Sequence, residues 1–498
     1  TLGQAVLENI PLESIERIEI VRGPLSSLYG SEAIGGVIQI FTREGRSGMH
    51  PSASIGAGIH RHRQASAGAS FGAGAFSGSI QATHQENRGF SSTNEKVPFG
   101  AFNPDTDGFR QNAVNASMAY RFDEDWQLKA RALRSEGKSQ YDDGPGADAR
   151  AGLTSQIAGM DLDGRISGNW RSTLRLARSL DVYDTLASAS PFTTLGAIDT
   201  SQQQVSWENR VSTPLGSVLA LAESLKQRVH KPGTDYTVTS RNINALALGL
   251  DGQSGAHTWQ GSVRHDHNSQ FGSVNTGNIA YGYAITSAWR AGAAWGKSFS
   301  APSFNLLYYP GFGNPDLLPE QGRNREVNLR WKPSDAHQLT LTAYSNRVRD
   351  YISAANTNIP RAKLDGATLA YEGRIGDWSL GASLDELHAR DDNGNRLPRR
   401  ARHSAKLIAD HDLGTFSYGA TLAAFGERED RSFDASFNPV AVTLPGFATL
   451  DVRADWRFER DWTLQLRLNN IANRRYETAY GYNQPGRELY VTLRWAMQ

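Results

Sequence analysis

The stretch ATLDVRADWRFERDWTLQLRL, Ala448 to Leu468, alternates apolar and polar residues in two runs that Glu459-Arg460-Asp461 separates. A period of two is typical of a β-strand with one apolar and one polar face. A short polar break between two such runs predicts a tight hairpin. The stretch therefore predicts paired strands in a sheet that separates water from an apolar phase, either lipid or a protein core.

The same layout recurs along the chain. Met118, Tyr120 and Phe122 precede the polar turn Asp123-Glu124-Asp125, and Trp126 follows it. Tryptophan directly after a turn is typical of membrane β-barrels, because the indole ring is stable at the headgroup layer. A soluble sandwich is the alternative, but strands with one charged face over more than 400 residues favour the barrel. Further copies of the layout lie at Ile166 to Trp170, Ile285 to Trp289 and Ile375 to Trp378.

Long polar stretches rich in Gly, Asp and Asn alternate with these short turns. Short turns at one end and long loops at the other are typical of outer-membrane barrels. From Pro51 to Gln498 the chain has room for about 22 strands. The sequence therefore predicts an all-β fold, a transmembrane antiparallel β-barrel. The predicted loops are Glu86 to Gln111, Ser135 to Thr154, Asp184 to Thr200, Asn305 to Arg323 and Arg428 to Pro445.

Composition excludes several other classes of protein. The 498 residues carry a formal charge of +1, so bulk charge does not point to nucleic acid as a partner. No run approaches the roughly 18 consecutive apolar residues of a transmembrane helix, and the mean hydropathy is -0.49. The chain has no cysteine, which excludes disulfides, thiol catalysis and thiolate metal sites.

The N-terminal residues differ from the rest. The segment IERIEIVRGPLSSLYGSEAIGGVIQIFT, Ile15 to Thr42, predicts two strands too short to cross a membrane, joined through a turn and a Gly35-Gly36 bend. It closely resembles the end of the plug domain of TonB-dependent outer-membrane receptors. We therefore predict two domains, the C-terminal part of a plug over residues 1–48 and a barrel over residues 49–498.

The end of the chain carries a second match. The segment NNIANRRYETAYGYNQPGRELYVTLRW, Asn469 to Trp495, resembles the C-terminal signature of the same family. Receptors of this type usually end in an aromatic residue, whereas this chain ends Ala496-Met497-Gln498. The residues expected to face lipid on the last strand are Leu489, Val491, Leu493, Trp495 and Met497.

Between its two ends the chain resembles the cobalamin (vitamin B12) receptor branch. The similar segments are NPDTDGFRQN (Asn103 to Asn112), RSEGKSQYDDG (Arg134 to Gly144), SVRHDHNSQFG (Ser262 to Gly272) and WGKSFSAPSFNLLYYPGFGNPDLLPE (Trp295 to Glu320). The resemblance implies a monomeric barrel in the outer membrane of a Gram-negative bacterium, among lipid and lipopolysaccharide. It implies active transport of cobalamin or a related corrinoid, energised by the TonB complex. The TonB-coupling box and the first part of the plug are not visible, so the chain is interpreted as a receptor fragment.

Other functions stay open. FSAP at Phe299 to Pro302 and NPDL at Asn314 to Leu317 resemble the paired boxes of haem receptors, but Ser303 to Gly313 contains no axial histidine. A ferric-siderophore receptor, a surface barrel enzyme and a passive channel are further alternatives. Gly68-Ala69-Ser70-Phe71-Gly72 matches a nucleophile elbow, but it lies in a strand-like stretch, so we predict no catalytic residue and no enzyme.

Candidate binding residues lie in the predicted loops and strand ends. Crowded carboxylates repel unless a hard cation binds, and oxygen ligands suit calcium; calcium-ordered loops are also what the resemblance implies. His60/His62 and His265/His267 are more simply polar loop or lumen residues. The predicted calcium ligands are Asp142, Asp143, Asp148 and Asp184, with Asp181 nearby in the sequence. The residues that the resemblance implies for the ligand are Tyr183, Asn268, Gln270, Thr276 and Arg428.

Overall fold

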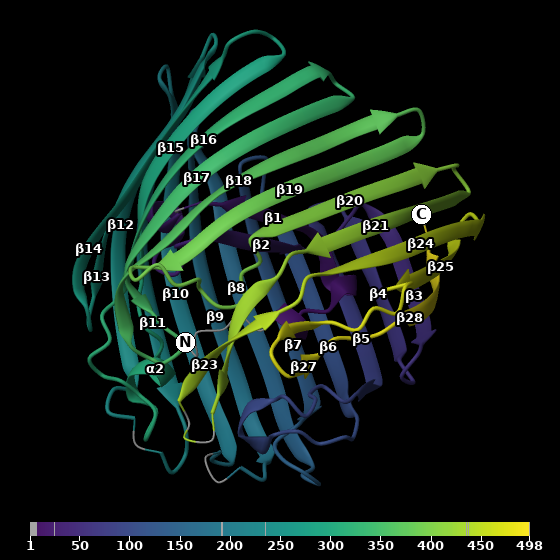
Figure 1. The fold of residues 1–498 in the computed structure, drawn as a ribbon. Coiled ribbons are helices and arrows are strands. Elements are labelled where there is room, and N and C mark those ends of the chain that lie inside the picture. The colour runs from purple at the N-terminus through teal and green to yellow at the C-terminus, as the bar shows by residue number, and fades with distance from the viewer. Residues whose placement is uncertain are drawn as a thin grey trace.

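The computed structural model describes residues 7–23, 25–190, 193–234, 236–434, 436 and 438–497. Its main feature is a closed antiparallel barrel of 22 strands (Figure 1), which confirms the predicted fold class. Each strand pairs with the next barrel strand in the chain, and β28 pairs with β3 to close the ring. The barrel strands are β3 (Gly48–Gly58), β4 (Arg63–Ala73), β5 (Phe76–Phe90), β6 (Asp107–Arg121), β7 (Trp126–Tyr141), β8 (Ala149–Ser167), β9 (Trp170–Ala187), β10 (Gly196–Thr213), β11 (Gly216–His230), β12 (Ser240–Ser254), β13 (His257–Asn268), β14 (Gly272–Ala284), β15 (Trp289–Ser300), β16 (Glu320–Ser334), β17 (His337–Ile352), β18 (Asn358–Ile375), β19 (Trp378–Asp391), β20 (His403–Asp412), β21 (Phe416–Phe425), β24 (Phe447–Glu459), β25 (Trp462–Asn469) and β28 (Glu488–Ala496).

The hairpin that opened the sequence analysis is confirmed as β24 and β25. Val452 lies opposite Leu468 and Arg453 opposite Arg467, so apolar and charged residues occupy opposite faces of the pair. Trp456 and Phe458 are exposed on the outer face. This is the arrangement that a wall between lipid and a watery lumen needs.

The two ends of the barrel differ. At one end, here called the turn end, strands join through short turns such as residues 123–125 and 376–377. At the other, the loop end, they join through longer segments, of which residues 301–319 are an example (lower part of Figure 1). The predicted loops were too long: β5 continues to Phe90, because backbone pairing persists after the alternation of apolar and polar residues has stopped.

Aromatic rings gather on the outer face near the turn end. Trp289 stacks on Trp331 with ring centroids 5.8 Å apart, and Trp378 contacts Tyr418 at 5.7 Å. Such a girdle marks the boundary between hydrocarbon and headgroups. The outer face between the girdle and the loop end exposes Leu, Val and Ile side chains, as expected for a surface in lipid.

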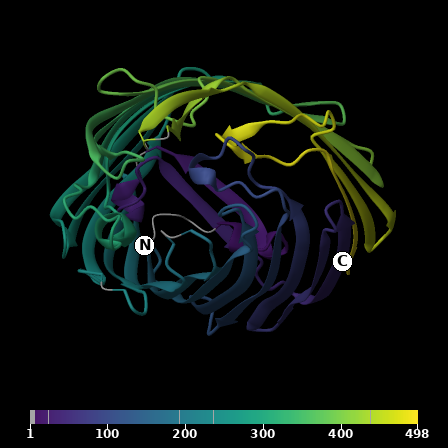
Figure 2. The same ribbon diagram turned by 60° about the horizontal axis from the view of Figure 1, so that its bottom comes forward.

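Residues 7–23 and 25–47 lie inside the barrel, where Figure 2 shows them crossing the lumen. We call these residues the luminal segment. Its β1 pairs with β2, as predicted from Ile15 to Thr42, while Pro24 lies outside the described residues. The predicted boundary between residues 1–48 and 49–498 stays a prediction. The luminal segment comprises η1 (Leu7–Asn9), η2 (Leu12–Ser14), β1 (Ile15–Arg22), α1 (Ser26–Tyr29) and β2 (Gly36–Thr42).

The loop end carries the remaining elements. Among the described residues, no helix is both long and apolar enough to cross a membrane. The loop-end elements are η3 (Pro98–Gly100), α2 (Phe304–Tyr308), β22 (Arg428–Phe433), β23 (Pro439–Leu444), β26 (Glu477–Ala479) and β27 (Tyr482–Asn483).

Candidate functional site

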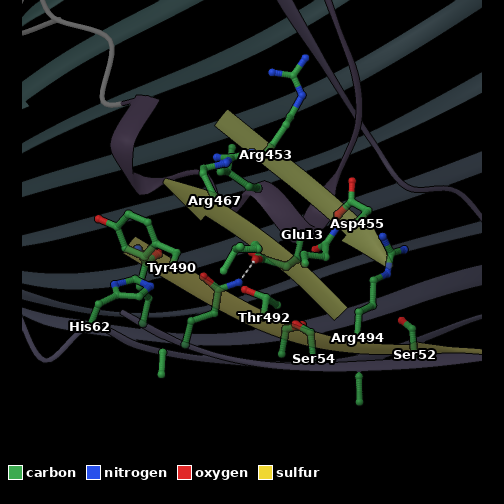
Figure 3. Close-up of a pocket in the computed structure, with 18 of the residues that line it drawn as sticks. Glu13, Ser52, Ser54, His62, Arg453, Asp455, Arg467, Tyr490, Thr492 and Arg494 are labelled. Atoms are coloured by element: carbon green, nitrogen blue, oxygen red, sulfur yellow. Dashed lines mark hydrogen bonds between the residues drawn. The ribbon is translucent and has the colours of Figure 1, made fainter. Parts of the chain in front are cut away.

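A polar cavity of about 550 Å³ lies between the luminal segment and the barrel wall (Figure 3). Leu12, Glu13 and Arg43 line it from the luminal segment, and strands β3 to β6, β24, β25 and β28 form the wall. Gln64 of β4 donates a hydrogen bond to Glu13 across the boundary, with Nε2 2.5 Å from Oε1. Alternation places these polar residues inside, because the other face of each strand meets lipid.

The cavity carries more positive than negative charge. Arg43 lies near Arg494 and Arg46, and burial together with these two like charges lowers the pKa of Arg43. His62 is 7% exposed, and its Nδ1 has no partner among the described residues. These features suit a hydrated cavity.

Helix α1 is the point where the luminal segment contacts the wall most closely. Ser262 of β13 donates to Ser27 with 2.7 Å between the two Oγ atoms, and both residues are buried. Beside them lies Arg264, which is 2% exposed and donates to Asp266 and to Glu223. The contact is polar and buried, so it fixes α1 in one position on the wall.

On the loop-end side of α1, the barrel loop that contains α2 folds inward. Phe304 at the start of α2 is fully buried, and it packs with Ile198, Val229 and Tyr236. The Tyr236 hydroxyl donates to Asn305 Oδ1 at 2.6 Å, and burial raises the pKa of Tyr236 to about 12. This cluster gives the loop end a fixed surface.

Asn268 and Gln270 border that cluster. Asn268 Oδ1 accepts from the backbone N–H groups of Gln270 (2.9 Å) and Phe271 (3.3 Å), which shapes the turn between β13 and β14. Gln270 Nε2 donates to the Tyr308 hydroxyl of α2. Asn268 Nδ2 and Gln270 Oε1 are buried and have no partner among the described residues. A buried donor and a buried acceptor without partners are costly unless a ligand or water satisfies them.

The other three predicted ligand residues lie apart from this pair. Thr276 lies in β14 nearer the turn end, opposite Arg264, and its Oγ1 has no partner among the described residues. Tyr183 pairs with Ile198 and so lies on the luminal face of β9. Arg428 belongs to the β22–β23 hairpin beyond β21.

Arg428 is a buried cation of the loop end. It is 6% exposed, its guanidinium carbon lies 4.8 Å from the ring centroid of Phe447, and burial lowers its pKa. Nε and Nη2 have no hydrogen-bond partner among the described residues. Neighbouring Asp430 instead accepts from Arg399 and from the Tyr480 backbone N–H, which joins three loops.

Of the predicted calcium ligands, only Asp142 lies in a carboxylate cluster. One oxygen from each of Asp105, Asp107 and Asp142 lies within 4.8 Å of the others. Asp142 Oδ2 accepts from the Thr93 backbone N–H at 3.1 Å, while its Oδ1 is buried without a partner among the described residues. Sequence reasoning missed Asp105 and Asp107, although both lie in the NPDTDGFRQN segment, because that contact joins two loops.

The other predicted acids have separate surroundings. Asp143 accepts from the Ser190 backbone N–H at 3.0 Å. Asp148 accepts from Arg150, and that hydrogen bond lowers the pKa of Asp148. Asp184 pairs with Gly152 and Ala197 within the sheet. The structure does not bring Asp143, Asp148 or Asp184 into the carboxylate cluster of Asp142.

The nucleophile-elbow match lies inside a barrel strand. Gly68 to Gly72 is part of β4, which pairs with β3 on one side and β5 on the other. A nucleophile elbow needs a strand, a sharp turn and a helix. His265 and His267, one of the two histidine pairs, both lie on the exposed face of β13.

Models of two families match the chain. The model described as "TonB dependent receptor-like, beta-barrel" matches residues 54–471, and the one described as "TonB-dependent Receptor Plug Domain" matches residues 1–37. Among curated proteins, the chain is 28% identical to the vitamin B12 transporter of Photobacterium profundum, covering 99% of this chain and 81% of that protein. It is also 28% identical to the vitamin B12 transporter of Vibrio vulnificus, covering 99% of this chain and 82% of that protein.

Solved structures share the fold. The siderophore receptor PirA from Acinetobacter baumannii superposes with a TM-score of 0.84 at 14% identity, over 98% of this chain and 86% of that one. A point mutant of the ferric enterobactin receptor PfeA from Pseudomonas aeruginosa superposes with a TM-score of 0.84 at 16% identity, with the same coverage. At these identities the likeness concerns the fold.

Proposed function

Since the chain belongs to the TonB-dependent receptors of the Gram-negative outer membrane, we propose that it takes up cobalamin or a related corrinoid. The family consists of receptors and transporters, so TonB coupling and a captured ligand are its general properties. The loop end then faces the cell exterior and the turn end the periplasm. The choice of corrinoid is supported by the similarity, over nearly the whole chain, to vitamin B12 transporters.

The observation that carries this proposal is the set of buried polar atoms without partners among the described residues. These atoms include side-chain atoms of Asn268, Gln270, Thr276 and Arg428, which are four of the five residues chosen from the sequence. A corrinoid carries many amide groups on its rim, and amides can donate to and accept from these side chains. Ligand binding would satisfy groups that the empty receptor leaves unpaired.

We expect cyanocobalamin to bind the detergent-solubilised receptor, and Arg428→Ala to weaken that binding. Loss of a hydrogen bond between the charged guanidinium and the ligand costs about 1.5–3 kcal/mol. The dissociation constant should therefore rise ~10–100-fold. Calorimetry with Thr276→Ala, Arg428→Ala and the exposed control Arg402→Ala measures this.

The same titration is run with haemin and with a ferric siderophore. Tight binding of either one, with no response to cyanocobalamin, contradicts the corrinoid assignment and makes this chain a haem or siderophore receptor. Equal affinities of the Arg428→Ala and Arg402→Ala variants would remove Arg428 from the site.

Calcium is the second part of the proposal, and it centres on Asp142. We expect calcium to draw Asp105, Asp107 and Asp142 together, because oxygen ligands suit this ion and its charge offsets the repulsion among carboxylates. Calcium titration should give a binding heat that Asp142→Asn and Asp107→Asn each remove. Asp148→Asn is the matched control, because Arg150 already neutralises that acid. A heat that survives in the first two variants places the ion elsewhere.

A further inference from the structure

The outer face of strands β15 to β19 carries five cations in one row, near the loop end. Cross-strand partners follow one another around the wall: Lys297 lies opposite Arg323, Arg323 opposite Arg347, Arg347 opposite Lys363, and Lys363 opposite Arg390. Directly opposed residues of a sheet lie on the same face. Strands are about 4.8 Å apart, so the row extends over roughly 19 Å. We call these five residues the cationic row.

The cationic row faces outward. Lys297, Arg323, Lys363 and Arg390 are exposed, and Arg347 is half-buried. Their neighbours along the strands, such as Ser298 and Asn324, are buried on the luminal side. The row therefore lies on the outer face of the barrel wall.

Flanking rows on the same face add more positive charge. Arg325 lies one outward position nearer the turn end, and Arg349 and Arg361 lie one position nearer the loop end. Acids neutralise only two of these eight cations among the described residues: Asp365 pairs with Arg347, and Asp350 pairs with Arg349. The other six have no salt bridge within the described chain.

The height of the row on the wall is also defined. The next outward residue after Arg325 on β16 is Val327, which is exposed, and Leu329 and Trp331 follow toward the turn end. An apolar band therefore begins directly on the turn-end side of the cations. This is where acyl chains give way to headgroups in the outer leaflet.

Like-charge pairs on one sheet face are unfavourable by themselves, and Lys297–Arg323 and Lys363–Arg390 are two such pairs in which neither cation has an acid partner among the described residues. Opposed like charges destabilise a sheet, and the low dielectric of a membrane boundary strengthens the repulsion. An anion that bridges neighbouring strands would reverse the sign of this contribution. Arginine binds phosphate through two parallel N–H groups, whereas lysine binds it as a point charge.

We propose that the cationic row is a binding site for an acylated lipid whose headgroup carries more than one phosphate, as lipid A of the outer leaflet does. The phosphates bridge Arg323, Lys363 and their neighbours, and the acyl chains lie along the apolar band on the turn-end side of the row. A row about 19 Å long has room for two separate phosphates. The site lies outside the barrel and is independent of the transported ligand.

The test compares Arg323→Gln/Lys363→Gln with Arg63→Gln/Arg110→Gln. Both double variants remove two outward positive charges near the loop end, but the control pair lies on either side of Glu86. Binding of diphosphoryl lipid A to the delipidated receptor in detergent is measured by native mass spectrometry. We expect the first variant to bind at least about tenfold more weakly, because each cation near an anionic surface contributes to binding, and the control to bind like the unmodified receptor.

Two further measurements distinguish recognition of the phosphorylated headgroup from nonspecific lipid binding. Dephosphorylated lipid A and phosphatidylglycerol should bind more weakly than diphosphoryl lipid A. Without lipid, the first variant should unfold at the same or a higher temperature than the unmodified receptor, because repulsion is relieved; with lipid A the order should reverse. Unchanged affinity of the first variant, equal affinity for all three lipids, or a lower unfolding temperature of that variant without lipid would each overturn the proposal.

Discussion

A disulfide between residues 27 and 262 should block uptake while leaving ligand binding intact. The two serine Oγ atoms lie 2.7 Å apart, close to the geometry that a disulfide requires. The chain contains no cysteine, so Ser27→Cys/Ser262→Cys can form no other intramolecular bridge. Because α1 lies inside the barrel on the wall, this bridge fixes the luminal segment where a solute must pass.

We expect uptake of cyanocobalamin into cells to fall to the level of cells without the receptor. Reduction with dithiothreitol should restore uptake. Binding of cyanocobalamin to the receptor in outer membranes should be the same for the oxidised and the reduced protein. The matched control is Ser54→Cys/Ser66→Cys, whose Oγ atoms are also 2.7 Å apart but both belong to the wall. Normal uptake through the oxidised Ser27→Cys/Ser262→Cys receptor would show that solutes pass without movement of α1.

Much of the fold could be predicted because its signals are local. The alternation in β24 and the Trp that opens β7 report which face meets lipid, since each strand responds to its own surroundings. The ends of the long loops could not be predicted, since strand pairing beyond the membrane needs no apolar alternation. The structure therefore shortened the predicted loops without changing the strand order.

The candidate site was less accessible to sequence reasoning. Asp142 was chosen from its own loop, but its neighbours Asp105 and Asp107 come from the preceding loop. The cationic row depends on register across five strands, and a shift of one residue would turn each side chain to the other face. Contacts of this kind are set by the closed barrel as a whole.

The buried ion pairs of Arg264 with Asp266 and Glu223, on the wall beside α1, depend on register in the same way. Arg264 donates to Asp266 at 2.9 Å and to Glu223 at 2.6 Å, and the side chains of Arg264, Asp266 and Glu223 are 1%, 7% and 11% exposed. A Cβ added at Gly30, which has a φ of +84°, would lie 3.2 Å from Arg264 Nη2. The luminal segment therefore approaches this group so closely that only glycine fits there without strain.

Replacing Arg264 with methionine should be among the most destabilising single changes in the barrel. It would leave Asp266, which is buried, and Glu223, which is partly buried, without their counter-ion, and breaking a buried ion pair in this way costs about 3–5 kcal/mol. The matched control, Arg453→Met, removes a cation from Asp410 where the two side chains are 33% and 41% exposed, and should cost less than about 1 kcal/mol. Urea unfolding in lipid vesicles measures the difference in the free energy of unfolding.

Neutralising the partners tests the cause. In Arg264→Met/Glu223→Gln/Asp266→Asn no buried charge remains without a counter-ion, so much of the lost stability should return. If the triple variant is no more stable than Arg264→Met, the loss comes from packing of the long side chain against α1 and not from unpaired charge.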